Sequence, residues 1–159
     1  MPWHDVLEII PSNSLTFTSS GIAIPGSSED NLCLKAYQLL NVDFKLAPVK
    51  IHLHKNIPIG AGLGGGSSDG AFVLKSLNSK FQLGLSDNEL EVYAAQLGSD
   101  CPFFIKNKPT LAINTGTDFS SIEVDLEGKF LVIIKPNIHV STADAYNGIV
   151  IKPKRNAVK

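Results

Sequence analysis

Five of the seven residues from Gly60 to Gly66 are glycines, in the run Pro58-Ile59-Gly60-Ala61-Gly62-Leu63-Gly64-Gly65-Gly66-Ser67-Ser68. Residues 49–55 alternate apolar and polar side chains, which predicts a strand before the run, and residues 69–81 carry an apolar stripe with helical spacing. Glycines tolerate positive φ and have no Cβ, so successive backbone N–H groups can converge on one anion, and a helix start adds its positive dipole end. The run therefore predicts a phosphate-binding loop.

This loop departs from two common nucleotide-binding patterns. It lacks the Gly-Lys-Ser/Thr ending of a Walker A loop, and no acidic residue follows a second strand about 20 residues later, as the dinucleotide fingerprint requires. The alternative without a ligand is a flexible hinge or a crowded turn. We favour phosphate binding because Ser67 and Ser68 stand at the predicted helix start, where their hydroxyls can donate to phosphate oxygens.

Composition narrows the class of protein. The chain has 159 residues and a formal net charge of −1, so it lacks the excess of basic residues that attracts the phosphates of nucleic acid. We therefore expect no nucleic-acid partner. It has no apolar run of the roughly 20 residues that span a bilayer and no pattern of a secretory signal at its start, so we expect no membrane contact. Its two cysteines are too few for a disulfide framework, which favours the cytoplasm.

Periodicity and capping signals predict the other elements. Capping-box patterns predict helices over residues 28–40 and 86–97, the second ending at Gly98, and a short last helix over 141–146. Runs rich in β-branched and aromatic residues predict short strands at residues 6–10, 15–18, 22–24, 102–105, 110–113 and 130–135. The basic tail 152–156 lacks apolar periodicity, and we expect it to be loose.

Three stretches resemble motifs of the GHMP kinase family. The glycine run, continued by Asp69, resembles the second family motif, and its long form Gly-Leu-Gly-Gly-Gly-Ser-Ser is similar to that of the diphosphocytidyl-methylerythritol kinase branch. Residues 97–104, Leu-Gly-Ser-Asp-Cys-Pro-Phe-Phe, are similar to Leu-Gly-Ala-Asp-Val-Pro-Phe-Phe of that branch, and residues 135–146 resemble the start of its second domain. The resemblance covers about residues 3–150.

The resemblance implies a fold and an activity. The fold would be α+β, with a GHMP N-terminal domain of the ribosomal protein S5 domain 2-like type, a two-layer mixed sheet with helices, over residues 1–127. Residues 128–159 would begin a second α+β domain. The activity would be ATP-dependent phosphorylation of the 2-hydroxyl of diphosphocytidyl-methylerythritol, a small-molecule substrate of the non-mevalonate route to isoprenoids, with Mg²⁺ accompanying ATP.

The resemblance also assigns roles to residues. Asp100 would be the catalytic aspartate, accepting the proton of the attacking hydroxyl or orienting it. Tyr146 would stack on the cytosine of the substrate. The ATP phosphates would lie on the glycine loop, whose residues are Pro58, Ile59, Gly60, Ala61, Gly62, Leu63, Gly64, Gly65, Gly66, Ser67 and Ser68. From the sequence alone, Asp100 is also explained as a turn or cap residue after Gly98, and Tyr146 as a core aromatic.

Two family segments do not occur in this sequence: the first strand, Ala-Lys-Ile-Asn-Leu, which carries a catalytic lysine, and an Arg-Pro-Asp-Gly-Tyr-His segment. We therefore expect an internal fragment with impaired activity, and an exposed sheet edge that favours a homodimer. Two other readings stay open: another GHMP kinase, of the mevalonate or homoserine type, and a non-catalytic nucleotide-binding fragment.

Two further groups of residues are given structural roles. His52 and His54 alternate on one predicted strand and so share a face, but no third ligand lies nearby in the sequence, so we predict no metal site and a solvent-facing position. Cys101 is predicted to be a small buried side chain rather than a nucleophile, because no activating histidine follows it.

Overall fold

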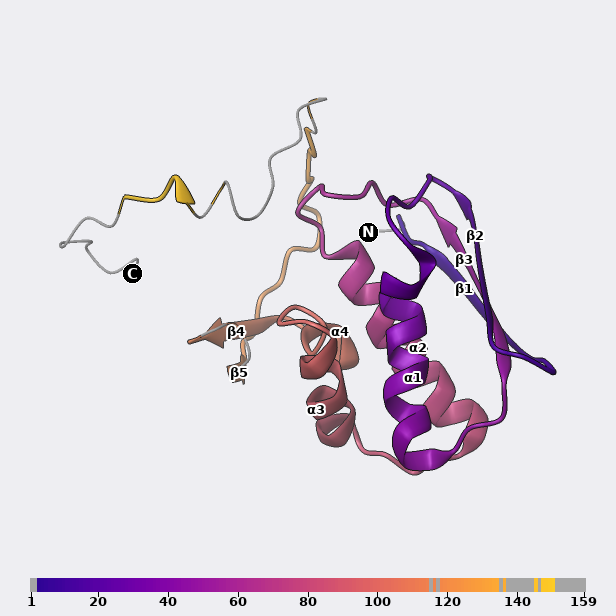
Figure 1. Ribbon diagram of the computed structural model, residues 1–159. Helices are drawn as coiled ribbons and strands as arrows, with labels where there is room; N and C mark the ends of the chain where they lie inside the picture. The colour runs from indigo at the N-terminus through magenta and orange to yellow at the C-terminus, as the bar shows by residue number, and fades with distance from the viewer. Residues whose placement is uncertain are drawn as a thin grey trace. The chain divides into compact units, whose positions relative to one another are not determined.

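The computed structural model describes residues 3–114, 116, 118–134, 136, 145 and 147–150, and its contacts divide the chain into residues 1–129 and 130–159. The described elements lie in the first unit (Figure 1). In chain order they are β1 Val6–Pro11, β2 Thr16–Gly21, the 3₁₀ helix η1 Ser28–Asp30, α1 Leu32–Phe44, β3 Val49–Lys55, α2 Gly65–Phe81, α3 Asp87–Leu97, α4 Phe103–Lys106, β4 Thr110–Ile113 and β5 Asp118–Ser121.

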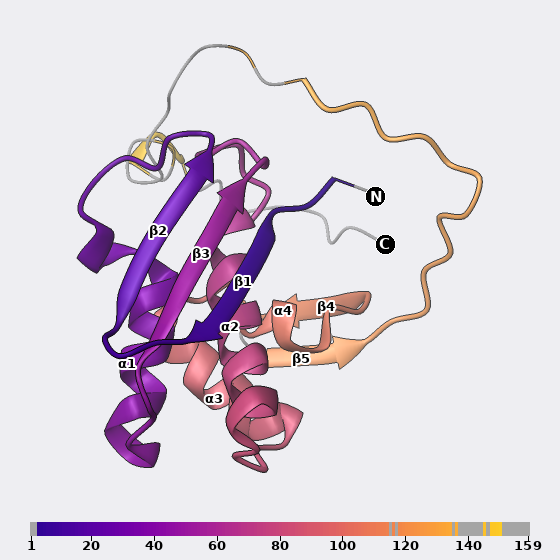
Figure 2. The ribbon, with the colours of Figure 1, turned by 90° about the vertical axis from the view of Figure 1, so that its right-hand side faces the viewer.

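A mixed three-stranded sheet forms one layer of this unit. Its order is β1-β3-β2, with β1 antiparallel and β2 parallel to the central strand β3. Figure 2 shows the sheet in front of α1 and α2, which cover one of its faces, while α3 packs on both of these helices and α4 packs on α2. The predicted α+β class with a two-layer mixed sheet is therefore confirmed.

The central strand β3 alternates between the two faces of the sheet, as its sequence predicts. Val49, Ile51 and Leu53 are buried under the helices. His52 and His54 point to the outer face, where the hydroxyl of Ser20 on β2 lies 2.9 Å from one ring nitrogen of each. The solvent-facing position expected for the two histidines is confirmed.

Helices α1 and α2 supply the other wall of the core. Their fully buried side chains include Leu40 of α1 and Leu74 and Leu77 of α2, which pack with Ile51 and Leu53 of the sheet. Burying a leucine or isoleucine side chain contributes about 1.5–3 kcal/mol each. This packing fixes the start of α2 relative to the end of β3, and the glycine loop lies between those two points.

The predicted first helix differs from the observed one at both ends. Ser27 caps only the 3₁₀ turn, and α1 starts after Asn31, whose side-chain oxygen accepts a hydrogen bond of 2.9 Å from the N–H of Cys33. Asn31 is extended, with φ −66° and ψ 131°, so it interrupts the helical backbone. At the other end α1 continues to Phe44, because its apolar face still packs on the core there.

Three predicted strands are wrong. Residues 102–105 lie in the turn and helix leading through α4, because Pro102 adopts helical φ −57° and ψ −36°, and a short apolar run fits a buried helical turn as well as a strand. Residues 22–24 are not a strand, because Gly21, the last residue of β2, pairs with Lys55 where β3 ends. Residues 130–134 are exposed and pair with no described strand.

The predicted start of α3 and one further strand are confirmed. Helix α3 has the expected capping box, in which Ser86 and Glu89 exchange hydrogen bonds, and Gly98 follows its last residue. Strand β4 is confirmed, although β5, its antiparallel partner, was not predicted. The predicted helix over 141–146 falls largely outside the described residues, as does Tyr146 itself. None of the helices in the described part of the chain has the length and apolar character that crossing a bilayer requires.

Candidate functional site

The glycine loop joins the end of β3 to the start of α2. Gly60, Gly62 and Gly64 have φ of 68°, 71° and 66°, in the left-handed region that glycine adopts without strain. Helix α2 begins at Gly65, two residues before the predicted start, because the left-handed Gly64 serves as its N-cap. The loop is therefore shorter than the sequence indicates, and the serines belong to the helix.

The start of α2 has no side-chain cap. Gly64 has no side chain to accept from the first turn, and the N–H of Ser68 makes the first helical bond, 2.8 Å to the carbonyl of Gly64. The N–H groups of Gly65, Gly66 and Ser67 precede that bond and have no carbonyl within the helix. Unpaired N–H groups and the helix dipole make such a start a binding site for anions.

A cavity of about 320 Å³ opens at this helix start. Besides the loop residues from 58 to 67, it is lined by Ile24, Asn31, Leu32, Leu53, Lys55 and Asp69. Ser68 does not line it and instead lines a second cavity of about 710 Å³, with Trp3, Phe72 and Phe104 among its walls. Leu63, Gly65 and Asp69 line both cavities, so the loop separates two hollows of the molecule.

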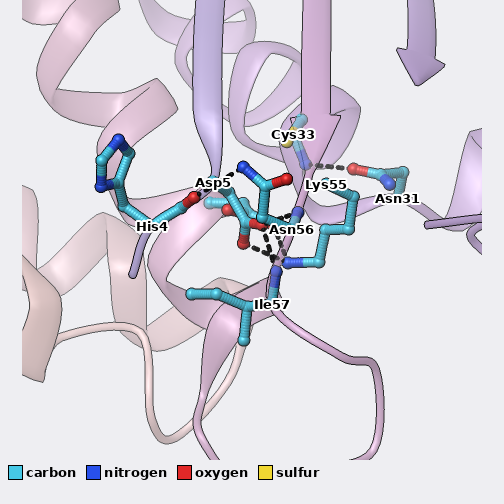
Figure 3. A network of polar contacts seen from close by, with 8 residues as sticks. His4, Asp5, Asn31, Cys33, Lys55, Asn56 and Ile57 are labelled. Carbon is cyan, nitrogen blue, oxygen red and sulfur yellow. Dashed lines mark hydrogen bonds and ion pairs between the residues drawn. The ribbon is translucent and has the colours of Figure 1, made fainter. Parts of the chain in front are cut away.

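A buried charge cluster lies at the base of the loop. The ammonium of Lys55 is 2.5 Å from a carboxylate oxygen of Asp5 and 2.7 Å from one of Asp69, and all three side chains are at least nine-tenths buried. The second oxygen of Asp5 accepts from the N–H groups of Asn56 at 2.6 Å and Ile57 at 2.8 Å. Figure 3 shows Asp5, Lys55, Asn56 and Ile57 converging at the end of β3.

The cluster changes the acid strength of its members. Burial raises the pKa of the Asp69 carboxyl to about 6, against the opposing effect of the Lys55 ammonium. Burial acts in the same direction on Asp5, but the N–H of Ile57, the Lys55 ammonium and the N–H of Asn56 together hold its pKa below the ordinary value. For Lys55, burial favours the neutral amine, yet the two carboxylates outweigh it and raise its pKa. Lys55 and Asp5 are therefore charged near neutral pH.

The sequence contained a signal for this cluster. Positions 49, 51, 53 and 55 fall on one face of β3, and the first three are apolar. A lysine on the buried face requires a partner of opposite charge, because burying an unpaired ammonium is prohibitively costly. The partners themselves were not predictable, since Asp5 is fifty residues away in the chain.

Asp100 lies exposed in the turn that follows α3. Its neighbour Cys101 is fully buried, as predicted, and burial raises the pKa of its thiol, although the thiol is near enough to Ser67 for that hydroxyl to oppose the rise. Three residues further, the ring of Phe104 packs so closely on Gly64 that a Cβ there would lie 2.8 Å from the ring tip. These two contacts hold the segment that carries Asp100 against the start of α2.

Histidine, cysteine and acidic residues do not form a metal cluster in the part of the chain that is described: no group of three or more is placed to hold an ion. Both cysteines are free and buried. The polar groups around the loop include its backbone N–H groups, the hydroxyl of Ser67, the side chain of Asn31 and the charge cluster.

The glycine loop lies within the part of the chain that a protein-family model matches. The family model for the GHMP kinases N terminal domain matches residues 31–108. The chain is 54% identical over 159 residues to a 4-diphosphocytidyl-2-C-methyl-D-erythritol kinase of Cytophaga hutchinsonii, covering 99% of this chain and 59% of that protein. It is 52% identical over 153 residues to the protein of the same name in Bacteroides fragilis, covering 94% of this chain and 56% of that one. The chain thus spans less than two thirds of the length of these relatives.

Solved structures give the same result. A crystal structure of 4-(cytidine 5'-diphospho)-2C-methyl-D-erythritol kinase superposes with a TM-score of 0.65 and 32% identity, covering 76% of this chain and 42% of that one. The phosphomevalonate kinase of Streptococcus pneumoniae, at 19% identity and a TM-score of 0.51 over 67% of this chain and 37% of that one, shares the fold alone. Together with the glycine loop and the fold, these matches show that the chain belongs to the GHMP kinase family.

Proposed function

We propose that this chain is part of an ATP-dependent kinase that phosphorylates the 2-hydroxyl of 4-diphosphocytidyl-2-C-methyl-D-erythritol, a step of the non-mevalonate route to isoprenoids. The observation that carries the proposal is the uncapped start of α2, which opens into a cavity lined by the glycine loop. The names of the relatives at 54% and 52% identity support the choice of substrate.

The loop fits the phosphates of ATP. The N–H groups of Gly65, Gly66 and Ser67 need an acceptor, and a Cβ at Gly66 would meet no atom within 4 Å, so an anion has room to approach. The Ser67 hydroxyl adds a donor. Mg²⁺ would enter with the nucleotide and neutralise part of the phosphate charge, which suits an ion that binds proteins mainly through substrate phosphates.

The second cavity is the proposed place for the acceptor substrate. It shares Leu63, Gly65 and Asp69 with the first cavity, so ligands in the two hollows would meet across the loop. Trp3, Phe72 and Phe104 give it aromatic surface suited to a nucleobase. Tyr146 remains a proposed stacking residue, on the resemblance alone.

Asp100 is the proposed catalytic residue. Asp100 lies four residues before Phe104, whose ring packs on Gly64, and a carboxylate brought to the cavity from there could accept the proton of the attacking hydroxyl or orient that hydroxyl toward the γ-phosphorus. We expect Asp100→Asn, in the whole natural protein, to lower kcat by about 10²–10⁴-fold, the usual contribution of a general base. The affinity for ATP should not change, since no phosphate contact is lost.

Neither Asp100 nor Asp87 lines the two cavities, but Asp87 is the first residue of α3, far along the chain from the segment that packs on the start of α2, so Asp87→Asn is the matched control for an exposed aspartate. Product formation is followed with the diphosphocytidyl substrate, mevalonate and homoserine side by side. Equal loss of kcat in both variants would refute the role of Asp100. Turnover of mevalonate or homoserine alone would move the chain to another branch of the family, and ATP binding without turnover of any substrate would favour a binding module.

We also propose self-association and a cytoplasmic location. The outer edges of β1 and β2 pair with no described strand, and free strand edges recruit further strands. Two buried free thiols suit a reducing compartment. Light scattering that gives the mass of one chain at high protein concentration would contradict self-association.

A further inference from the structure

The charge cluster of Asp5, Lys55 and Asp69 connects the two ends of the glycine loop. Lys55 is the last residue of β3, before the loop, and Asp69 lies in α2, after it. Their ion pair of 2.7 Å therefore closes the segment 56–68 at its base. Asp5 fixes the first residues of that segment, because its carboxylate accepts from the N–H groups of Asn56 and Ile57.

The cluster also touches the phosphate-binding residues directly. A Cβ built on Gly65 would lie 3.1 Å from the Lys55 ammonium, so this buried charge lies against the first residue of α2. A displacement of Lys55 would therefore shift Gly65 and the N–H groups that face the cavity. Lys55 and Asp69 line the cavity themselves, and through Gly65 the cluster also sets the position of the loop that an anion would meet.

Stability alone does not account for three buried charges. Replacing a buried ion pair by apolar side chains of similar volume is often neutral or stabilising, because desolvation offsets the attraction between the charges. Such groups are retained in some proteins because they select one conformation among several. A glycine-rich loop has many conformations to lose, so selection of one of them is a physical advantage at this place.

We infer that Asp5, Lys55 and Asp69 are positioning residues that hold the glycine loop in its anion-binding conformation before a ligand arrives. The inference rests on the proposed function for its ligand, a triphosphate, but not for its structural part. A loop that is ordered in advance loses less entropy on binding, so the cluster should strengthen triphosphate binding through the order of the loop, and hydrogen exchange in the ligand-free chain measures that order separately from any contact with the triphosphate.

The three members are not equivalent, which makes the inference testable by rescue. Without Lys55, the Asp5 carboxylate keeps two backbone N–H donors. Asp69 loses the ammonium that its carboxylate oxygen contacts and is left facing Asp5. Lys55→Met should therefore disturb the loop mainly by stranding Asp69, and adding Asp69→Asn should relieve that disturbance.

The experiment measures hydrogen exchange in the ligand-free chain and binding of ATP and of inorganic triphosphate by calorimetry. The variants are Lys55→Met, Asp69→Asn and the double variant. Lys35→Met is the matched control, because Lys35 forms an exposed ion pair with Asp30 on η1. The reporting amides are those of Ile57 and Ser68 at the ends of the loop, with the amide of Leu90, bonded to Ser86 in α3, as reference.

We expect Lys55→Met to speed exchange at Ile57 and Ser68 by about tenfold relative to Leu90, and to weaken triphosphate binding by about tenfold, since it strands a buried carboxylate. The double variant should recover most of both losses, and Asp69→Asn alone should show less of either. Lys35→Met should match the unmodified chain.

Equal acceleration at Leu90 and at the loop in Lys55→Met, with unchanged triphosphate affinity well below the melting temperature, would mean a merely structural cluster and overturn the inference. So would a double variant that is no better than Lys55→Met. If the unmodified chain binds no triphosphate, the proposed function fails, while the exchange data still decide whether the cluster holds the loop. If Lys55→Met does not fold, Asp69→Asn must still accelerate Ile57 and Ser68 selectively, or the inference fails.

Discussion

The contact between Gly64 and Phe104 can be tested with a pair of alanine substitutions that differ in one respect. Gly62 and Gly64 both have left-handed φ, at 71° and 66°. A Cβ on Gly62 would meet no atom within 4 Å, whereas one on Gly64 would lie 2.8 Å from Cζ and 3.0 Å from Cε2 of Phe104. The difference between Gly64→Ala and Gly62→Ala therefore isolates the clash.

The expected magnitudes follow from these two contributions. An alanine forced into the left-handed region costs about 1–2 kcal/mol at either position. Overpacking at position 64 adds about 1–3 kcal/mol, because a crowded side chain has to move. Movement of the Phe104 ring also has a cost, since it would disrupt the edge contact with the ring of Phe103 at 5.0 Å between centroids.

The assay is urea unfolding of the two alanine variants, of Phe104→Leu and of the double variant Gly64→Ala/Phe104→Leu. Gly64→Ala should lower the free energy of unfolding by about 2–5 kcal/mol and Gly62→Ala by only about 1–2 kcal/mol. Leucine lacks the ring tip, so the double variant should lose less than the sum of its two single changes. Equal losses for the two alanines, or strict additivity in the double variant, would refute the close packing of Phe104 on the loop.

Two further variants test other parts of the chain. Ser86→Ala should lower the free energy of unfolding by about 1 kcal/mol, because it removes the capping box of α3; thermal denaturation measures it, and an unchanged melting temperature would contradict the cap. Asp69→Asn tests the raised pKa of Asp69, which moves from 3.8 in the unfolded chain to about 6 in the folded one. The folded state binds the proton of the Asp69 carboxyl more tightly than the unfolded state does. The protonated carboxyl therefore stabilises the fold fully below pH 3.8, and this stabilisation is lost as the pH rises to about 6. The free energy of unfolding of the unmodified chain minus that of the variant should therefore fall by about 3 kcal/mol across this window and stay level above it. A difference that rises with pH would mean that the pKa is lowered instead.

Elements with strong local signals were predictable from sequence. The alternation of residues 49–55 gave the central strand its buried and exposed faces, and the Ser86 and Glu89 pair marked the start of α3. Short apolar runs were not predictable in the same way. The run after Cys101 forms a helical turn and residues 22–24 pair with no strand, because runs of three or four apolar residues are compatible with more than one structure and tertiary contacts choose between them.

The amino-acid order alone determined that a glycine loop joins a strand to a helix and that its backbone N–H groups are free to converge on one side, since positive φ and the absence of Cβ are local properties of glycine. Only the tertiary structure decided what lies around that loop. Lys55 forms an ion pair with Asp5, which comes from a remote segment of the chain. Phe104, four residues after Asp100, packs on Gly64. Charge pairing and close packing depend on distance in space, which the order of residues along the chain does not contain.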